Sequence, residues 1–469
     1  MELMIAVFIV GYVCIAMEHK LMVDKAAIAL FMAGLMWVLY VLTSPLSSMI
    51  ENQELFNEFI SNNHALSSLS LIEQCRRYII DSQLVDYLGD ISSTLFFLIG
   101  AMTIVELIDA NNGFSVITDR IETKDKRRLL YIITIITFFM SSVLDNLTTS
   151  IVMVILVKKL IPNFKERWIF GSMIIIAANS GGAWSPIGDV TTIMLWIKGR
   201  ISTLPLITSL FIPSAISTLV PLIFISRLLK GEIKGEVKKT VSQPELLTGK
   251  RESRIIFVIG IMALLSVPLF KYITGLPPFV GILFALALIW IYTEILFSRP
   301  KYQYSGKNRV TSILKRIDTT TILFFLGILL SVMSLEATGI LNKLGHLLNE
   351  QTKNVYVINL TIGVLSSIVD NVPLVAVAMG MYPIVDPSAV ATMADPSFMQ
   401  HFVMNGEFWQ FLAYCTGVGG SILIIGSAAG VVVMGLEKIK FNWYLKYISL
   451  YAVVGYFAGA LSYILIKLI

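Results

Sequence analysis

The chain has 469 residues, of which 56% are hydrophobic and only 14% are Asp, Glu, Lys or Arg. With a mean hydropathy of +0.78, this composition excludes an ordinary soluble domain and is typical of a polytopic membrane protein in contact with a lipid bilayer. The formal net charge of +5 does not indicate a nucleic-acid partner, because in a membrane protein the placement of Lys and Arg matters more than their sum.

Apolar runs of about 20 residues recur along the chain and predict membrane-spanning helices. The first run lacks a basic segment before it and an A-x-A-like cleavage site, so we expect a retained helix and not a signal peptide. Spans are expected at 3–17, 24–43, 88–110, 168–197, 204–226, 255–271, 276–297, 319–341, 407–436 and 443–467. This pattern predicts an all-α polytopic membrane protein.

The three cysteines, Cys14, Cys75 and Cys415, are scattered singly and form no CxxC motif or Cys/His cluster. The sequence therefore predicts neither a disulfide framework nor a resident metal site. We also expect no cofactor.

Two further apolar runs, 129–160 and 355–380, contain related polar motifs. SSVLDNLTTSIVM begins at Ser141 and SSIVDNVPLVAVAM begins at Ser366, an offset of 225 residues. A bare charge in the middle of a membrane segment costs roughly 2.5–3.5 kcal/mol on insertion scales, so the Asp-Asn pair of each motif needs a compensating role. A duplicated polar break of this kind is typical of a secondary transporter built from two repeats around a midplane site.

Each of these runs could be one spanning helix or a re-entrant hairpin with the Asp-Asn pair at its tip. If both are hairpins, the connections on one face carry 28 Lys and Arg residues and those on the other face carry 7. A single span at 129–160 would instead place the basic connections 115–129 and 158–167 on opposite sides. The positive-inside rule therefore favours two hairpins of opposite orientation, a cytoplasmic basic face and extracytoplasmic termini.

The two hairpin tips carry helix-start signals. Pro373 follows Asn371 by two residues, and Pro is tolerated in the first turn of a helix, so we expect a helix to begin at Asn371. In the first hairpin, Asp145 or Asn146 can cap a helix that begins at Leu147.

A long apolar run broken by glycine follows each hairpin. The first contains NSGGAWSPIGDVTT from Asn179, and the second contains TGVGGSILIIGSAAG from Thr416, with the glycines related by an offset of 238. These runs predict discontinuous helices whose unwound centres expose backbone carbonyls. Asp189 has Ser427 as its counterpart, so the two halves differ in charge.

The predicted architecture has two inverted repeats, each with a re-entrant hairpin and a discontinuous helix. Its expected parts are N-terminal helices with an external loop at 1–87, a first repeat at 88–226 with hairpin 129–160 and broken helix 168–197, a cytoplasmic basic linker at 227–254, and a second repeat at 255–469 with hairpin 355–380 and broken helix 407–436.

The paired SSxxDN motifs, the SGGAWSPIGD break and the N-terminal stretch GYVCIAMEHKLMVDKAAIAL resemble the NhaD-type Na+/H+ antiporters of the ion transporter superfamily. The resemblance covers nearly the whole chain and implies a homodimer whose protomers have a scaffold domain and a transport domain. It further implies that cations bind at the hairpin tips and broken helices. Those roles would fall on Asp145, Asn146, Thr149, Ser150 and Asp189 in one half, and on Ser367, Asp370, Asn371, Ser421 and Ser427 in the other.

Three functions were compared from residue chemistry. Carboxylate, amide, hydroxyl and backbone oxygens suit Na+ or Li+, and a carboxylate can carry H+ instead, which favours a cation/proton antiporter in a bacterial plasma (inner) membrane. A Na+-coupled anion carrier (dicarboxylate-like) or arsenite-type exporter of the same superfamily is the alternative, although Asp145, Asp189 and Asp370 would repel an anion. An intramembrane aspartyl protease is less favoured, because Tyr87-Leu88-Gly89-Asp90 lacks one glycine of its Gly-x-Gly-Asp signature.

Overall fold

The computed structural model describes residues 2–17, 21–118, 123–233, 249–299, 309–368, 370–393 and 395–468. Within these ranges the protein is helical and has no β-strand, only two isolated bridges that join Asp125 to Glu232 and Val385 to Val403. Eight of the described helices are long and apolar enough to cross a membrane. The prediction of an all-α polytopic membrane protein is therefore confirmed.

The chain divides into two compact units. The first unit comprises Met1–Phe96, Asp318–Asn354 and Val372–Pro383, and the second comprises Phe97–Ile317, Val355–Asn371 and Ile384–Ile469. The second expected hairpin is divided between them, because its first arm and its Asp370-Asn371 pair fall in the second unit and the rest of its second arm falls in the first. The predicted domain boundaries remain a prediction.

The first unit is organised around two long helices. It contains α1 (Glu2–Ala16), α3 (Lys25–Thr43), α4 (Leu46–Glu51), α5 (Gln53–Asn62), α6 (Leu71–Tyr78), the start of α7 (Leu84–Ala110), α17 (Thr319–Ala337), α18 (Ile340–Gln351) and most of α20 (Asn371–Met381). Helices α3 and α17 pack closely, because a Cβ at Gly327 would lie 2.6 Å from the backbone carbon of Ala29. The Trp37 indole N–H donates to the Leu330 carbonyl at 3.0 Å across this contact.

The segment 44–87, which the sequence predicts as an external loop, carries helices of its own. Helices α4, α5 and α6 pack on one another, and Phe56, Cys75 and Tyr78 form a small buried cluster. A five-residue π-helical turn, Ile79–Gln83, then leads into α7. These helices are short and polar on one face, so a search for long apolar runs does not detect them.

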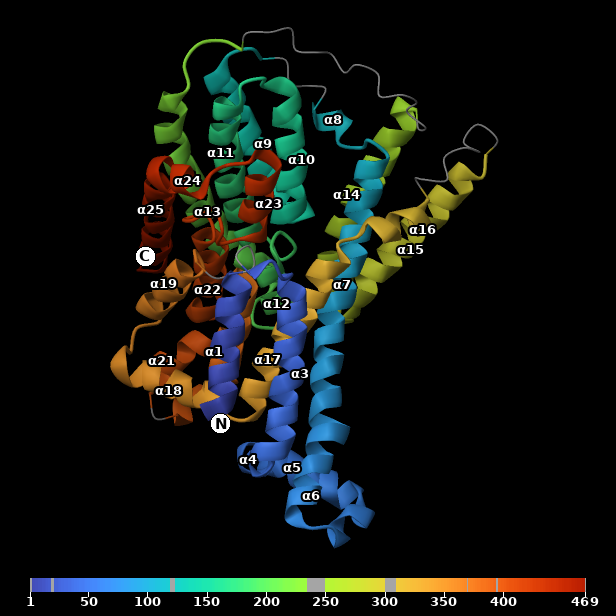
Figure 1. Cartoon of the computed structure of the whole chain (residues 1–469), viewed down its shortest axis with the longest axis vertical. Helices are drawn as coiled ribbons and strands as arrows, with labels where there is room; N and C mark the ends of the chain where they lie inside the picture. The colour runs from blue at the N-terminus through green and yellow to red at the C-terminus, as the bar shows by residue number, and fades with distance from the viewer. Residues whose placement is uncertain are drawn as a thin grey trace. The chain divides into compact units, whose positions relative to one another are not determined.

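The second unit contains the first hairpin and both broken helices (Figure 1). Its helices are α8 (Ser115–Thr118), α9 (Lys126–Leu144), α10 (Asn146–Leu160), α11 (Phe164–Ala183), α12 (Val190–Ile197), α13 (Thr203–Ile225), α14 (Lys250–Thr274), α15 (Pro278–Phe297), α16 (Val310–Ile313), α19 (Val355–Leu365), α21 (Pro396–Met399), α22 (Glu407–Gly419), α23 (Ala428–Glu437), α24 (Phe441–Tyr447) and α25 (Ser449–Leu468). Helices α9 and α10 lie side by side and are joined at Asp145, and α10 also packs on α11 and α23.

Helix α11 is the centre of this unit. It is buried from Phe170 to Ala183 and packs on α9, α10, α13, α22 and α23. Its last turns are rich in Ala, Ser and Gly, which allow neighbouring backbones to approach closely. The polar side chains near its end are therefore held inside the protein and not against lipid.

Two helices of the unit stop and restart at the glycine-rich segments. Helix α11 ends at Ala183 and α12 begins at Val190, while α22 ends at Gly419 and α23 begins at Ala428. Asp189 and Ser427 are the N-caps of the restarted helices, with nearly the same backbone angles of φ −145°, ψ 146° and φ −145°, ψ 153°. The two non-helical segments meet buried backbone and side chains, which is the setting that irregular structure at membrane depth requires.

Candidate functional site

The tip of the first hairpin is a single residue, Asp145. Its φ of 77° lies in the left-handed region, which costs a non-glycine residue about 1–3 kcal/mol. Its carboxylate accepts from the Thr148 backbone N–H at 2.8 Å and from the Thr148 hydroxyl at 2.9 Å. Asp145 is therefore the cap of α10, and that helix begins at Asn146, one residue before the predicted start at Leu147.

Asp189 is a buried carboxylate on which side chains from both motifs converge. Its own helix start supplies the Thr191 backbone N–H and hydroxyl, both at 2.9 Å from Oδ1. The Asn146 amide donates to Oδ2 at 2.7 Å, and the Asn371 amide lies 3.3 Å from the same oxygen. The Asp189 residue is 1% exposed, so these donors replace the water that an exposed carboxylate would bind.

Asn179, in the last turns of α11, joins the two broken helices. Its carbonyl oxygen accepts from the Asn146 amide at 3.1 Å, and its own amide donates to the Ser421 hydroxyl at 3.0 Å and to the Ser427 hydroxyl at 2.8 Å. The sequence analysis did not single out Asn179. An asparagine inside an otherwise apolar run, two residues before Gly181-Gly182, is the signal that could have identified it.

The two halves of the site make corresponding contacts at the sequence offsets of the motifs. The Ser141 hydroxyl donates to the Ala178 carbonyl, and the Ser366 hydroxyl donates to the Thr416 carbonyl. The serines are 225 residues apart and their acceptors are 238 residues apart, which are the offsets of the hairpin and glycine motifs.

The glycines of the broken helices repeat this correspondence. A Cβ at Gly181 would lie 2.2 Å from the Phe138 carbonyl oxygen, and a Cβ at Gly419 would lie 2.1 Å from the Gly363 carbonyl oxygen. At both positions a side chain would overlap the backbone of the preceding hairpin arm, so the close approach requires glycine.

Two hydroxyl oxygens in the first turns of α10 are buried without a partner. Thr149 and Ser150 are both 0% exposed, and neither side-chain oxygen has a hydrogen bond within the described part of the chain. Ser367 differs, since its recorded hydrogen bond goes to the Val364 carbonyl of its own segment. Buried hydroxyls without partners are costly, so the oxygens of Thr149 and Ser150 are free to bind a ligand.

Asp189 also interacts electrostatically with the other two carboxylates of the motifs, Asp145 and Asp370. The recorded donors to Asp145 and Asp189 are amides, hydroxyls and backbone N–H groups, and none comes from Lys or Arg among the described residues. Three carboxylates that share a buried region without a cationic side chain form a site suited to a cation or a proton.

No group of three His, Cys, Asp or Glu side chains within the described ranges is placed to hold a metal ion by itself. Amides, hydroxyls and the backbone carbonyls of the unwound segments would therefore complete the coordination of a hard cation.

Comparison with known proteins followed from this arrangement. A family profile described as Citrate transporter (CitMHS) matches residues 12–400. Sodium/proton antiporter 2 of Arabidopsis thaliana is 42% identical over 98% of this chain and 98% of its own length, and Sodium/proton antiporter 1 of that plant is 42% identical over 98% of this chain and 72% of its own length. The Na(+)/H(+) antiporter NhaD of Vibrio cholerae is 26% identical over 98% of this chain and 91% of its own length.

Proposed function

Because the chain belongs to the citrate transporter family and, within it, to the NhaD-type antiporters, we propose that it exports Na+ in exchange for H+. Li+ is the expected second substrate, since it prefers the same hard oxygen ligands. The observation that carries the proposal is the convergence of the Asn146 and Asn371 amides on the buried Asp189 carboxylate.

The exchange mechanism uses competition for the same oxygens. Asp145, Asp189 and Asp370 supply the charge, and Asn146, Asn371, Ser421 and Ser427 with the unpartnered hydroxyls of Thr149 and Ser150 supply neutral oxygens. Ser367 contributes through its backbone near Gly426. A cation that enters the site displaces the proton of a carboxylate, and protonation expels the cation. Obligatory exchange follows because the carboxylates do not cross the membrane empty and charged.

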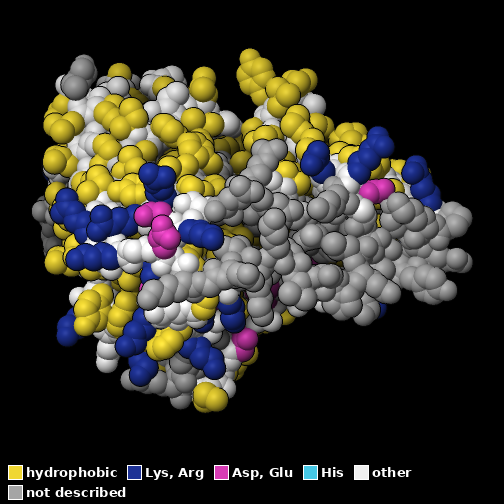
Figure 2. Space-filling model, turned by 90° about the horizontal axis from the view of Figure 1, so that it is seen from above, with side chains coloured by type: hydrophobic (Ala, Val, Ile, Leu, Met, Phe, Trp, Pro, Cys, Tyr) yellow, Lys and Arg dark blue, Asp and Glu magenta, His cyan; other side chains and the backbone are white. Residues whose placement is uncertain are grey.

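The membrane orientation is part of the proposal. Figure 2 shows Lys and Arg side chains gathered on one end of the molecule. Exposed Lys158, Lys165 and Lys230 lie in the connections assigned to the basic face. We place this end in the cytoplasm, with both chain termini on the other side and the protein as a homodimer. The bacterial NhaD relatives support a bacterial plasma membrane, and the plant relatives make a plant membrane the alternative.

A Na+-coupled anion carrier is the competing function, and the family name Citrate transporter favours it. A di- or tricarboxylate, however, requires cationic or neutral donors, typically Arg. The recorded contacts of Asp145 and Asp189 would present carboxylates to such a substrate, which is repulsive.

Everted membrane vesicles from a strain without its own Na+/H+ antiporters test the proposal. Addition of Na+ or Li+ should dissipate a preformed pH gradient without any organic substrate. A gradient that collapses only when citrate or another dicarboxylate is added with Na+ would identify the anion carrier instead.

A further inference from the structure

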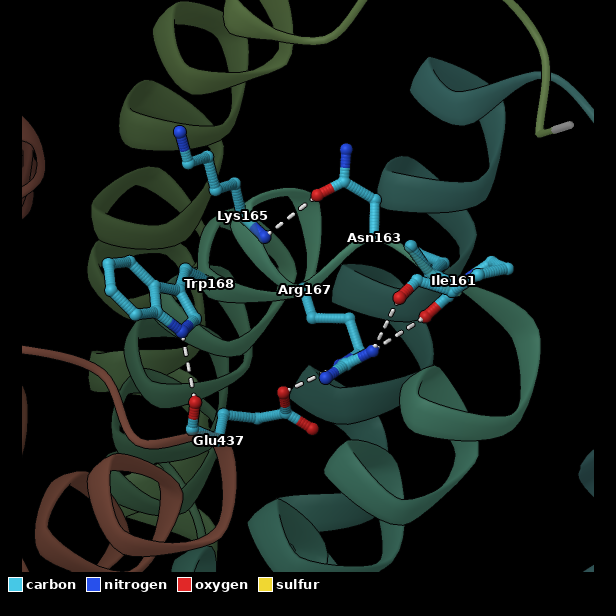
Figure 3. Close-up of polar contacts among 7 residues, drawn as sticks. Ile161, Asn163, Lys165, Arg167, Trp168 and Glu437 are labelled. Carbon is cyan, nitrogen blue, oxygen red and sulfur yellow. Dashed lines mark hydrogen bonds and ion pairs between the residues drawn. The ribbon is translucent and has the colours of Figure 1, made fainter.

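The first turn of α11 carries a buried ion pair far along the chain from the candidate site. The Arg167 Nε donates to the Glu437 carboxylate at 2.6 Å, and the Arg167 Nη1 donates to the carbonyls of Ile161 and Pro162 at 3.1 and 2.9 Å. We call these four residues the Arg167 clasp. Figure 3 shows the guanidinium between the Ile161 carbonyl and the Glu437 carboxylate.

Glu437 depends on this contact. Its side chain is 1% exposed, and its second carboxylate oxygen has no hydrogen-bond partner within the described part of the chain. Its backbone carbonyl accepts from the Trp168 indole at 2.9 Å, and α23 ends at this residue because Lys438 turns to a φ of 54°. A buried carboxylate without a paired cation is strongly unfavourable, so Arg167 stabilises the charge on Glu437.

Three helices each have one end at the clasp and the other at the candidate site. Helix α10 runs from Asn146 to the Ile161-Pro162 connection, α23 runs from the cap Ser427 to Glu437, and α11 runs from Arg167 to Asn179. These helical paths of 10 to 15 residues are about 15–22 Å long at 1.5 Å per residue. Fixing the far ends of three short packed helices therefore fixes how their near ends, which hold the ligands, lie relative to one another.

The Arg fork is suited to this task. One planar guanidinium addresses a carboxylate on one segment and two carbonyls on another, which a Lys amine cannot do in the same geometry. Lys126 and Glu166 form a neighbouring ion pair at 2.8 Å, but it joins the start of α9 to α11 and does not reach α23. The two ion pairs lie in adjacent residues of one helix turn and connect different partners.

We propose that Arg167 is a positioning residue for cation exchange, which through Glu437 and the Ile161-Pro162 carbonyls holds α10, α11 and α23 in the register that the candidate site requires. This inference rests on the proposed Na+/H+ exchange. Arg167 acts through the three helices and does not contact the cation.

The test measures Na+ binding and exchange in four forms of the full chain: wild type, Arg167→Gln, Arg167→Gln/Glu437→Gln, and the control Glu166→Gln. The double variant removes both charges together, so it breaks the clasp without leaving a buried unpaired carboxylate. Apparent Na+ affinity is read from everted vesicles and, independently, from the shift of thermal unfolding of purified protein with Na+ concentration.

The two clasp variants should weaken apparent Na+ affinity about tenfold, with exchange at saturating Na+ within about twofold of wild type, as removal of a supporting contact does at other ion sites. Glu166→Gln should keep the wild-type affinity. Arg167→Lys should lie between wild type and Arg167→Gln.

Three results would overturn the inference. They are wild-type Na+ affinity in the double variant, an equal loss in Glu166→Gln, and a loss confined to protein amount with affinity unchanged. Failure of the proposed function is distinguishable, because the wild-type protein would then show no Na+-dependent loss of the pH gradient.

Discussion

The Asn146 amide nitrogen lies 2.7 Å from the Asp189 carboxylate, and this contact joins the first hairpin to the first broken helix. Because Asp189 also receives the Asn371 amide, one carboxylate links both Asp-Asn motifs. Its counterpart in the second broken helix, Ser427, carries no charge and accepts from Asn179. The two broken helices are therefore similar in backbone and different in electrostatics.

This difference predicts unequal effects of substitution. Asp189→Asn should reduce Na+/H+ exchange far more than Ser427→Ala, because it removes a charge that Asn146 and Asn371 both bind. Initial rates of Na+-induced loss of a pH gradient in everted vesicles, at matched protein levels, provide the measurement. Equal and mild losses would show that Asp189 only caps α12.

Asn179 should be as important as the motif residues that the sequence identifies. Asn179→Ala removes an acceptor from Asn146 and a donor from Ser421 and Ser427, and each buried partner left unpaired costs about 1–3 kcal/mol. We expect exchange to fall at least about tenfold, since these energies are of that size. Ser180→Ala is the matched control, because Ser180 contacts Ser217 instead of the site. Full exchange in Asn179→Ala would remove it from the mechanism.

The site was predictable where composition marks it. Charged and amide residues inside apolar runs identified Asp145, Asn146, Asp189 and Asn371, because a polar group at that depth requires a role. Asn179 was missed because a single amide beside small residues is also compatible with simple helix packing. Only the folded chain shows that Asn179 contacts side chains 33 to 248 positions away in sequence.

The fold was predictable to a similar degree. Long apolar runs located the spanning helices, and glycine pairs located the interruptions after Ala183 and Gly419. The helices within 44–87 were missed, since their stability comes from the packing of Phe56 on Tyr78 and not from a continuous apolar run. Tertiary packing of short amphipathic helices leaves a weak signal in a single sequence.

Glycine at the helix crossings gives a stability prediction. Gly181→Ala and Gly419→Ala would each force a backbone shift against a carbonyl oxygen, at a cost of about 1–3 kcal/mol. Both should lower the thermal unfolding midpoint of purified protein. Gly435→Ala, which meets nothing within 4 Å in α23, should leave the midpoint unchanged or raise it. Equal midpoints in all three variants would contradict the close crossings.

The hairpin topology predicts which side of the membrane each connection faces. Single cysteines at Thr123 and Lys165, in a chain without its native cysteines, should react with an impermeant reagent from the cytoplasmic side, and one at Ser388 should react from outside. The charge distribution is the physical reason. Labelling of Thr123 and Lys165 from opposite sides would show that 129–160 crosses the membrane once.

The dependence of apparent Na+ affinity on pH tests the shared-carboxylate mechanism most directly. If H+ and Na+ compete for Asp145, Asp189 and Asp370, affinity should weaken as pH falls, by up to about tenfold per pH unit for each proton displaced. The measurement is Na+-induced decay of the pH gradient at several pH values, in wild type and in Asp145→Asn. The account predicts a steep pH dependence in wild type and loss of coupled exchange in the variant. An affinity that is constant from acidic to alkaline pH, with full exchange in Asp145→Asn, would contradict it.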